Sequence, residues 1–424
     1  MTTFNTKSTA NTEPAFNYDL VISGGGMVGL ALAIAAAKLD LTVAVIEKNT
    51  AIEPSRELNG PTPYNSRVSA INHSSEQLLK NLKVWQQIPH DRLSAYQQMH
   101  VWDRLGEGAL TFHASDAHQT HLGHIIENQQ LLSALTEIAQ QHRLISLKYT
   151  TSIESWHQDA QQVRLTTDSG ETLTCRQLIA CEGKQSVLRE QAGIASWRWN
   201  YHHSAVVCTV RHQQAHQQCA RQVFLESGPL AFLPLPDEHQ SAIVWSTQPD
   251  QADALLAMSD EQFCQQLEYS FETQLGKVEA VSKRQLQPLS AQQAQLYFNN
   301  RLVIVGDSAH AIHPLAGLGV NLGFLDVAAL AEQWQWAKGK SIDIADRRVM
   351  RRFQRQRQSH NLAVAGLMET IKRLFSNDST AAVILRNRVL KRLNPLSTLK
   401  RPLIEGAMGL TGVTLPPLCQ PNDE

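Results

Sequence analysis

The stretch from residue 18 to residue 47 constrains the fold of this chain more than any other. It reads YDLVIS, GGGMVG, LALAIAAAKLD and LTVAVIE, which predicts a strand, a glycine turn, a helix and a second strand. Gly24, Gly26 and Gly29 supply a G-x-G-x-x-G pattern. The first glycine of this pattern permits a tight turn, the second lets a phosphate approach the backbone, and the third lets helix and strand pack closely. Because the helix N-terminus offers unpaired N–H groups to a diphosphate, we expect a dinucleotide site here.

Glu47 ends the second strand, near the offset at which an acidic residue holds the ribose hydroxyls of an adenosine. A 2′-phosphate would bring a second anion to this place, so FAD or NAD is preferred to NADP. The alternative is a glycine-rich turn of an α/β core in which Glu47 is only solvated. That alternative leaves the register of the three glycines unexplained.

A second glycine-rich segment follows another predicted strand. RLVIVGD, residues 301–307, is rich in β-branched residues and ends at Gly306 and Asp307. Ligands of parallel sheets bind beyond the carboxyl ends of the strands, which is where Asp307 is expected. The segment HPLAGLGVNLGF then precedes a predicted helix, LDVAALAEQWQWA. Each glycine costs conformational entropy on folding, so we infer that something lies close against this backbone.

Composition excludes several classes of function. The formal net charge of −1 provides no basic excess for nucleic-acid binding. The longest apolar run, residues 28–37, is about half of the roughly 20 residues that span a bilayer, so no transmembrane helix is predicted. The six cysteines lack zinc-site spacing, and a reducing cytosol fits them best. Residues 1–16 are polar, lack the features of a signal peptide, and are expected to be disordered.

Together these motifs show a resemblance to a known family. GGGMVG, the central GD and PLAGLGVNLG resemble the class A flavoprotein aromatic hydroxylases, which are single-component monooxygenases that carry FAD. RVSAINHSSEQLL, HLGHIIEN and RQVFLESGPLAFLPL narrow the resemblance to the hydroxylases of ubiquinone biosynthesis, and among them to those acting on a polyprenylphenol. The similarity runs from about residue 18 to about residue 410.

The resemblance implies a role for each matching position. Gly24, Gly26, Gly29 and Glu47 would bind the ADP half of FAD, and Arg67 would lie near the diphosphate or the flavin. Asn128 would approach the ribityl chain, and Asp307 would hold its hydroxyls. The positions expected at or beside the flavin ring are Pro314, Gly317, Leu318, Gly319 and Asn321.

For several of these residues an ordinary structural role is the alternative. Arg67 is otherwise a surface arginine, and Asn128 is otherwise the N-cap of the predicted helix QQLLSALTEIAQQ. His310 and His313 are expected to take part in the hydrogen bonding of their loop, because no third metal ligand lies near them in the sequence. No metal site is predicted.

The chain departs from the family pattern at two positions. The middle fingerprint usually reads ADGxxSxxR, whereas this chain reads CEGKQSVLR, with Glu182 in place of Asp and with Ser186 and Arg189 retained. The additional methylene moves the carboxylate by about an ångström or more. Leu318 replaces the usual Gln of AGQG, which is tolerable where that position contributes its backbone N–H.

The predicted fold is α/β, with a Rossmann-like FAD-binding domain interrupted by a substrate domain that is an antiparallel sheet. The three strands DLVIS, QLIACEG and LVIVGD are far apart in the sequence, which indicates the interruption. The predicted division is a tail at 1–16, the FAD-binding domain at 17–190 and 288–345, the substrate domain at 191–287, and a C-terminal helical region at 346–424.

The C-terminal region is rich in arginine and lysine, and two interpretations stay open. RRVMRRFQRQR and NRVLKRLNPLSTLKRPLIEGAMGL read either as solvated helix faces or as a peripheral surface for anionic lipid of the inner membrane or for a biosynthetic complex. Flotation of full-length and truncated protein with liposomes tests the lipid interpretation. Negligible binding by both would rule it out.

The family also implies a reaction. NADPH or NADH would bind transiently and reduce FAD, and reaction with O2 would give a flavin C4a-hydroperoxide that hydroxylates the aromatic ring of the prenylated phenol. The chain has no second G-x-G-x-x-G, which fits a transient reductant. The alternatives are an FAD-dependent reductase of isoprenoid lipids and a non-catalytic assembly subunit.

Overall fold

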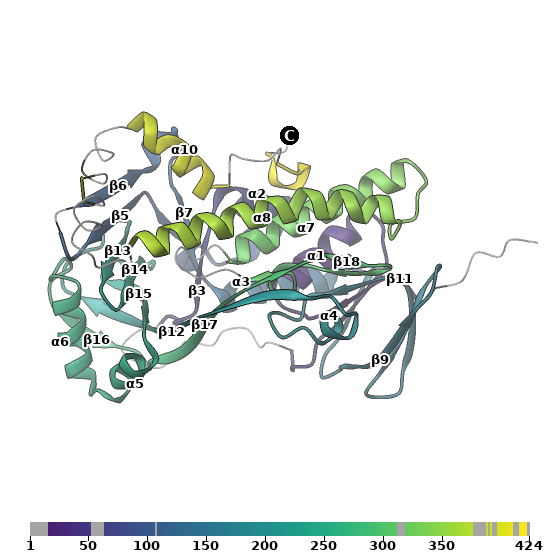
Figure 1. The fold of residues 1–424 in the computed structure, drawn as a ribbon, viewed down its shortest axis with the longest axis horizontal. Coiled ribbons are helices and arrows are strands. Elements are labelled where there is room, and N and C mark those ends of the chain that lie inside the picture. Colours follow the sequence, from purple (N-terminus) through teal and green to yellow (C-terminus); the bar gives the residue numbers. More distant parts are fainter. Residues whose placement is uncertain are drawn as a thin grey trace, which may run out of the picture.

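The computed structural model describes residues 16–51, 63–106, 108–311, 319–375, 387–388, 391, 397–409 and 415–421. Two large sheets lie end to end, and the long helix α8 (Arg347–Phe375) runs along one side of the molecule above α7 (Gly319–Gly339), as Figure 1 shows. α10 (Ser397–Ala407) lies near one end of this layer of helices.

The first sheet has eight strands, and most of them are parallel. Its order is β18 (Phe298–Asn299), β19 (Leu302–Ile304), β11 (Thr172–Ala180), β1 (Tyr18–Ser23), β2 (Val43–Ile46) and β8 (Ile145–Lys148). β9 (Ile153–Gln158) and β10 (Val163–Thr167) extend it through antiparallel pairing to β11. β19, β11 and β1 are neighbours, so the three strands that the sequence separates widely do belong to one parallel sheet. Their buried apolar runs are typical of strands covered on both faces.

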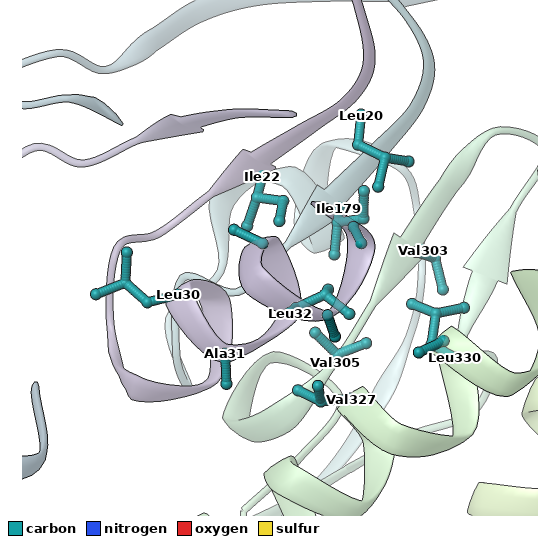
Figure 2. Packing of buried hydrophobic residues seen from close by; sticks show 14 of the residues in the cluster. Leu20, Ile22, Leu30, Ala31, Leu32, Ile179, Val303, Val305, Val327 and Leu330 are labelled. Carbon is teal, nitrogen blue, oxygen red and sulfur yellow. The ribbon is translucent and has the colours of Figure 1, made fainter. Parts of the chain in front are cut away.

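Helices bury this sheet. α1 (Met27–Ala37) packs against α7 and against α3 (Asn128–Gln141), and Figure 2 shows side chains of β1, α1 and α7 meeting in one apolar cluster. Glycine sets how closely the helices approach, because a Cβ at Gly323 of α7 would lie 2.6 Å from Cγ2 of Val28 on α1. The shorter α4 (Val187–Gln191) follows β11.

The second sheet has nine strands. Its order is β20 (His310–Ala311), β17 (Gln285–Ala294), β12 (Ser196–His212), β15 (Gln240–Thr247), β14 (Gly228–Pro234), β13 (Cys219–Leu225), β5 (Gln98–Asp103) and β6 (Ala109–His113), and β16 (Val278–Val281) pairs with β12. α5 (Pro249–Ala257) and α6 (Asp260–Ser270) are its helices. Phe263 and Leu267 of α6 lie in the same apolar cluster as Val206 of β12 and Trp245 of β15.

This sheet differs from the predicted division in two respects. Residues 98–113 were expected in the FAD-binding domain, but β5 pairs with β13, and this pairing is parallel in a sheet expected to be antiparallel. The substrate domain was expected to end at residue 287. β17 (Gln285–Ala294) crosses this boundary, so residues 288–294 also belong to the second sheet. Alternation of apolar and polar residues predicts a strand, but it does not reveal which sheet the strand joins.

The structure also contains a small third sheet of three strands. It has the order β3 (Val68–Ile71), β7 (Gly123–Glu127) and β4 (Ser94–Tyr96), and α2 (His73–Asn81) follows β3 directly. Short 3₁₀ turns occur at Trp85–Gln87, His90–Arg92, Ala114–Ala117, Gly306–Ser308 and Pro417–Cys419. Within the described ranges, no helix combines the length and the apolar character needed to cross a bilayer.

Two glycines of α7 allow a matched test of the packing against α1. Gly323→Ala should lower the free energy of unfolding by about 1–3 kcal/mol, because the new methyl group overpacks against the β-branched Val28. Gly339→Ala on the same helix meets no atom within 4 Å and should be neutral or stabilising. Denaturant unfolding of both variants measures the difference, and equal stability would contradict this account of the packing.

Candidate functional site

The candidate site lies at the carboxyl edge of the first sheet. Because β1, β2, β11 and β19 are parallel, the segments that follow them meet at this edge. These segments are the glycine turn after β1, Glu47 after β2, residues 181–189 after β11 and the Gly306–Ser308 turn after β19. This edge is where ligands of such sheets bind.

The glycine turn is built by close backbone contacts. Gly24 has φ of 110°, and a Cβ there would overlap the carbonyl group of Cys181. A Cβ at Gly29 would overlap the carbonyl oxygen of Gly24, which is the close packing expected of the third glycine. Gly26 differs, since it is exposed and a Cβ there would meet no atom of the described residues within 4 Å. Protein packing therefore requires glycine at two of the three positions and leaves the surface of Gly26 open to a ligand.

Within the described residues, no side chain caps the N-terminus of α1. Gly26 is its N-cap, no side chain of the described part of the chain caps this end, and the first turn contains no acidic residue. The first N–H groups of a helix need an acceptor, and their partial positive charge favours an anion. This end of α1 can therefore hold a phosphate group.

Glu47 is held against the glycine turn. Its Oε2 accepts a hydrogen bond from the backbone N–H of Gly25 at 2.7 Å, and its Oε1 accepts from the backbone and the side chain of Asn49 at 2.9 and 2.6 Å. The carboxylate is thus oriented at the turn, and it is half-buried.

Glu182 joins two elements at the edge. Its Oε1 accepts from Ser23 Oγ at 2.7 Å, and its Oε2 accepts from Ser186 Oγ at 2.6 Å and from the backbone N–H of Leu188 at 3.1 Å. The longer side chain therefore reaches from the end of β1 to the start of α4. This structural role was not predicted from the sequence.

Arg189, from the same fingerprint, is buried and holds two loops together. Its guanidinium donates to the carbonyl oxygens of Lys184 at 3.0 Å and Ser308 at 3.2 Å. Ser308 Oγ also donates to the carbonyl oxygen of Gly183 at 3.2 Å. The segments after β11 and β19 are therefore fixed relative to each other.

Asp307 has an exposed side chain although protein atoms surround it closely. This burial among protein atoms raises the pKa of its carboxyl group, while the nearby Lys184 and His310 oppose the shift. No hydrogen bond to its carboxylate is found within the described part of the chain, so the carboxylate can accept from a ligand.

A buried carboxylate supports this turn from behind. Asp326 of α7 is completely buried, and its Oδ2 accepts from the backbone N–H of Gly306 at 3.0 Å and from His310 Nε2 at 2.5 Å. Its Oδ1 accepts from Arg357 Nε of α8 at 2.8 Å. Burial acts to raise the pKa of Asp326, but attraction to His310 and Arg357 outweighs it and holds that pKa well below its usual range.

The sequence reasoning missed Asp326 and Arg357. The arginine-rich segment was read as a solvated or lipid-facing surface, and Arg347, Arg348, Arg351, Arg352 and Arg355 are indeed exposed. Arg357 is buried instead. It continues the helical spacing of the buried Val349, Met350 and Phe353, and this spacing was the available signal.

His310 contacts Asp326 as part of the hydrogen bonding around its loop, which confirms that expectation. His313, Pro314, Gly317 and Leu318 fall within 312–318, outside the described residues. Gly319 is the first described residue of α7, and a Cβ there would meet no protein atom within 4 Å.

Asn321, Arg67 and Asn128 lie around β3. Asn321 is buried and joins α7 to this strand, since its Nδ2 donates to the carbonyl oxygen of Ala70 at 2.7 Å and its Oδ1 accepts from the backbone N–H of Asn72 at 3.1 Å. Arg67 is exposed, and its carbonyl oxygen accepts from the backbone N–H of Asn128 at 2.9 Å.

The alternative role given to Asn128, the N-cap of the following helix, is wrong. The helix begins one residue earlier than that role requires, so Glu127 is the N-cap and makes no side-chain cap. Asn128 Oδ1 accepts from Ser69 Oγ at 2.6 Å instead. The side chain and the backbone N–H of Asn128 both bond to the β3 side, to Ser69 and to the carbonyl oxygen of Arg67, so this Asn side chain is not available as a cap.

The Asp326–Arg357 pair provides a test of the buried charge. Arg357→Met should lower the free energy of unfolding by roughly 3–5 kcal/mol, because it leaves the Asp326 carboxylate buried without its cation. Arg355→Met, two residues away on the exposed face of α8, should change stability by no more than about 0.5 kcal/mol. Chemical denaturation compares the two, and similar stabilities would show that the pair does not hold α8.

Comparisons with known proteins agree with this architecture. Residues 17–360 match the FAD binding domain family. The chain is 32% identical to the mitochondrial ubiquinone biosynthesis monooxygenase COQ6 of Xenopus tropicalis, with 94% of each chain covered. It is also 32% identical to the 3-demethoxyubiquinol 3-hydroxylase of Escherichia coli, over 92% of this chain and 98% of that one.

The fold is shared with a solved structure of lower identity. The p-nitrophenol 4-monooxygenase PnpA of Pseudomonas putida superposes with a TM-score of 0.75 at 18% identity, over 93% of this chain and 98% of that one. The family match, the relatives and the fold lead to one conclusion: this chain belongs to the FAD-dependent hydroxylases of ubiquinone biosynthesis, which are class A flavoprotein monooxygenases.

Proposed function

We propose that the chain hydroxylates the aromatic ring of a polyprenylphenol intermediate of ubiquinone biosynthesis, with FAD as its cofactor, NADPH or NADH as a transient reductant and O2 as co-substrate. The observation that carries the polyprenyl part of this proposal is an apolar cavity of about 440 Å³ between α7, α8 and α10. Family membership supports the hydroxylation.

The cavity suits a hydrocarbon chain. Its walls include Leu322 and Leu325 of α7, Val364 and Leu367 of α8, and Leu403 of α10. Its volume lies within the range of about 300–1,000 Å³ for pockets that bind small molecules. Leu367 and Leu403 are 48% and 49% exposed, so the cavity opens at an apolar rim. An apolar chain gains free energy by leaving water for such walls.

One side of the cavity approaches the expected flavin region. Asn72, Asn321 and Arg357 line it together with the leucines, and Asn321 lies three residues after Leu318 in the segment for which flavin contacts are predicted. A prenyl chain in the cavity could therefore hold an attached ring near the start of α7.

The residues around the glycine turn suit FAD. We assign the diphosphate to the N-terminus of α1 at Gly26, the adenosine ribose to Glu47, and the ribityl hydroxyls to the exposed carboxylate of Asp307. FAD, when bound, supplies the redox chemistry and the activation of O2. The chain's own contribution is to orient the cofactor and the ring and to exclude water from them.

The flavin contacts of Arg67, Asn128, Pro314, Gly317, Leu318, Gly319 and Asn321 also stay predictions. So does contact of the C-terminal region with a lipid surface or a biosynthetic complex. The exposed leucines of the cavity rim and the exposed arginines of α8 support the lipid contact.

Asp307 provides the test of the cofactor assignment. Asp307→Ala should weaken FAD binding by about 10- to 150-fold, because one charge-assisted hydrogen bond contributes about 1.5–3 kcal/mol. Stability without FAD should not change, since the side chain is exposed. Asp307→Asn should lose less FAD affinity than Asp307→Ala, because the amide oxygen of Asn can still accept a hydrogen bond. Flavin content and fluorescence titration measure the effect, and an FAD affinity of the alanine variant equal to that of the wild type would overturn the assignment.

The reaction is tested by NADPH and NADH oxidation in air with a prenylphenol, followed by mass analysis of the product. We expect bound flavin, substrate-stimulated oxidation and a gain of one oxygen atom. Flavin without oxygen insertion would favour a reductase, and no flavin after reconstitution would favour an assembly subunit.

Two leucines on α8 test the cavity in the same assay. Leu367→Asp at the rim should raise KM for a long-chain prenylphenol about tenfold, the equivalent of about 1.4 kcal/mol, and should leave KM for a short-chain analogue unchanged. Leu362→Asp is the control, because Leu362 is similarly exposed at 42% but does not line the cavity. Equal KM values for the two variants would contradict the placement of the chain.

A further inference from the structure

Three histidines and one glutamate meet where α2 packs beside β7. His73 and Glu76 lie in the first turns of α2, while His124 lies on β7 and His121 just before it. The ring centroids of His73 and His121 are 4.3 Å apart, and the ring centroids of His121 and His124 are 4.5 Å apart. No local sequence pattern groups these residues, because the two pairs come from segments more than forty residues apart.

Glu76 is the centre of this cluster. It is only 5% exposed, and its Oε1 accepts from Lys80 Nζ at 2.6 Å. The other oxygen, Oε2, faces two imidazoles at once, with His121 Nε2 at 2.8 Å and His124 Nδ1 at 3.3 Å. His124 Nδ1 is buried and makes no hydrogen bond of acceptable geometry within the described residues. A buried polar atom without a partner costs free energy.

The hydrogen bonds around the cluster indicate which ring nitrogen of each histidine carries a proton. His73 Nε2 lies 2.7 Å from the carbonyl oxygen of His121, which can only accept, so His73 carries its proton on Nε2 and has a lone pair on Nδ1. His121 Nδ1 lies 2.9 Å from Thr120 Oγ1. If this nitrogen donates to Thr120, then Nε2 of His121 turns a lone pair toward the carboxylate. In the other tautomer Nε2 donates to Glu76; metal binding uses the first tautomer, in which a cation between the two groups removes the repulsion of the lone pair and the carboxylate.

We propose that His73, Glu76, His121 and His124 bind a divalent transition-metal ion, and that zinc is the ion this donor set fits best. One ligand atom each from His73, Glu76 and His121 already lie within 4.8 Å of one another. Zinc binds imidazole nitrogen and carboxylate oxygen at about 2.0–2.2 Å, so small side-chain shifts close the site. Imidazole donors disfavour magnesium and calcium, which prefer oxygen.

Four protein ligands make this a structural site, since a catalytic zinc keeps a position open for water or substrate. The Thr120 hydroxyl would orient His121, as outer partners of metal-bound histidines do. The metal would join α2 to β7. Asn72, the N-cap of α2, also contacts Asn321 of α7, so the ion would stabilise the region in which β3 and α7 meet.

The test uses full-length, tag-free protein with FAD, treated with a chelator and then titrated with zinc against a chromogenic competitor. Wild type should take up one equivalent tightly, and zinc should raise its thermal unfolding midpoint. His121→Ala and His124→Ala should bind zinc at least about tenfold more weakly, because even outer-sphere losses cost 10–100-fold. Zinc should not raise their unfolding midpoints.

Lys80→Met is the matched control. It removes the other partner of Glu76 but leaves all four ligands, so its zinc affinity should stay within about threefold of wild type, well below the loss expected for a missing ligand. Failure of the wild type to take up zinc would overturn the proposal, and so would equal uptake by the wild type and both histidine variants. If a variant does not fold, the wild-type titration still decides.

Discussion

The buried carboxylate of Asp326 is the interaction on which the candidate site depends. It joins the turn after β19, helix α7 and helix α8, because its two oxygens accept from Gly306, His310 and Arg357. A buried charge is tolerated only when it is paired and hydrogen-bonded, so these three segments are held in one arrangement. The exposed Asp307 is the next residue after Gly306, and its position follows from that arrangement. The buried ion pairs of Asp326 thus orient the turn that carries Asp307 relative to α7 and α8. Apolar packing between α1 and α7 sets the distance between these helices.

On its other side, the same edge of the sheet is held by close glycine packing and by the hydrogen bonds of Glu182 and Arg189. Gly24 and Gly29 let the turn after β1 fold against Cys181 and against itself, and Glu182 ties that turn to α4 through two serines. Arg189 then connects the segment after β11 to the one after β19. The segments that follow β1, β11 and β19 are therefore each held by specific contacts. Gly26 and Asp307 lie among these segments, and the protein does not use them for its own packing.

Sequence predicted the features that depend on local pattern. Gly24, Gly29 and the strands β1, β11 and β19 could be found because turn geometry and buried apolar runs are written in consecutive residues. Arg357 was not found, since its partner Asp326 is 31 residues away and only the helical period of its own segment pointed inward. Glu182 looked like a weakened version of a usual Asp, but its partners Ser23 and Ser186 show how the longer side chain is used. The grouping of His73 with His121 likewise required the pairing of β3 and β7, which no local signal specifies.

The order of strands in the second sheet has a consequence for how the chain reaches its native state. β5 and β6 leave the ribosome before most of the first sheet, yet β5 pairs with β13, and β19 completes the parallel sheet only after β17 has been made. Loops of this length must be closed before their contacts stabilise anything, which slows folding. Because strands of the two sheets alternate along the chain, neither sheet has all its strands until β19 and β20 have been synthesised. Until β13 is synthesised, the edge of β5 that pairs with it in the native sheet has no partner strand, and an unpaired edge of this kind promotes aggregation.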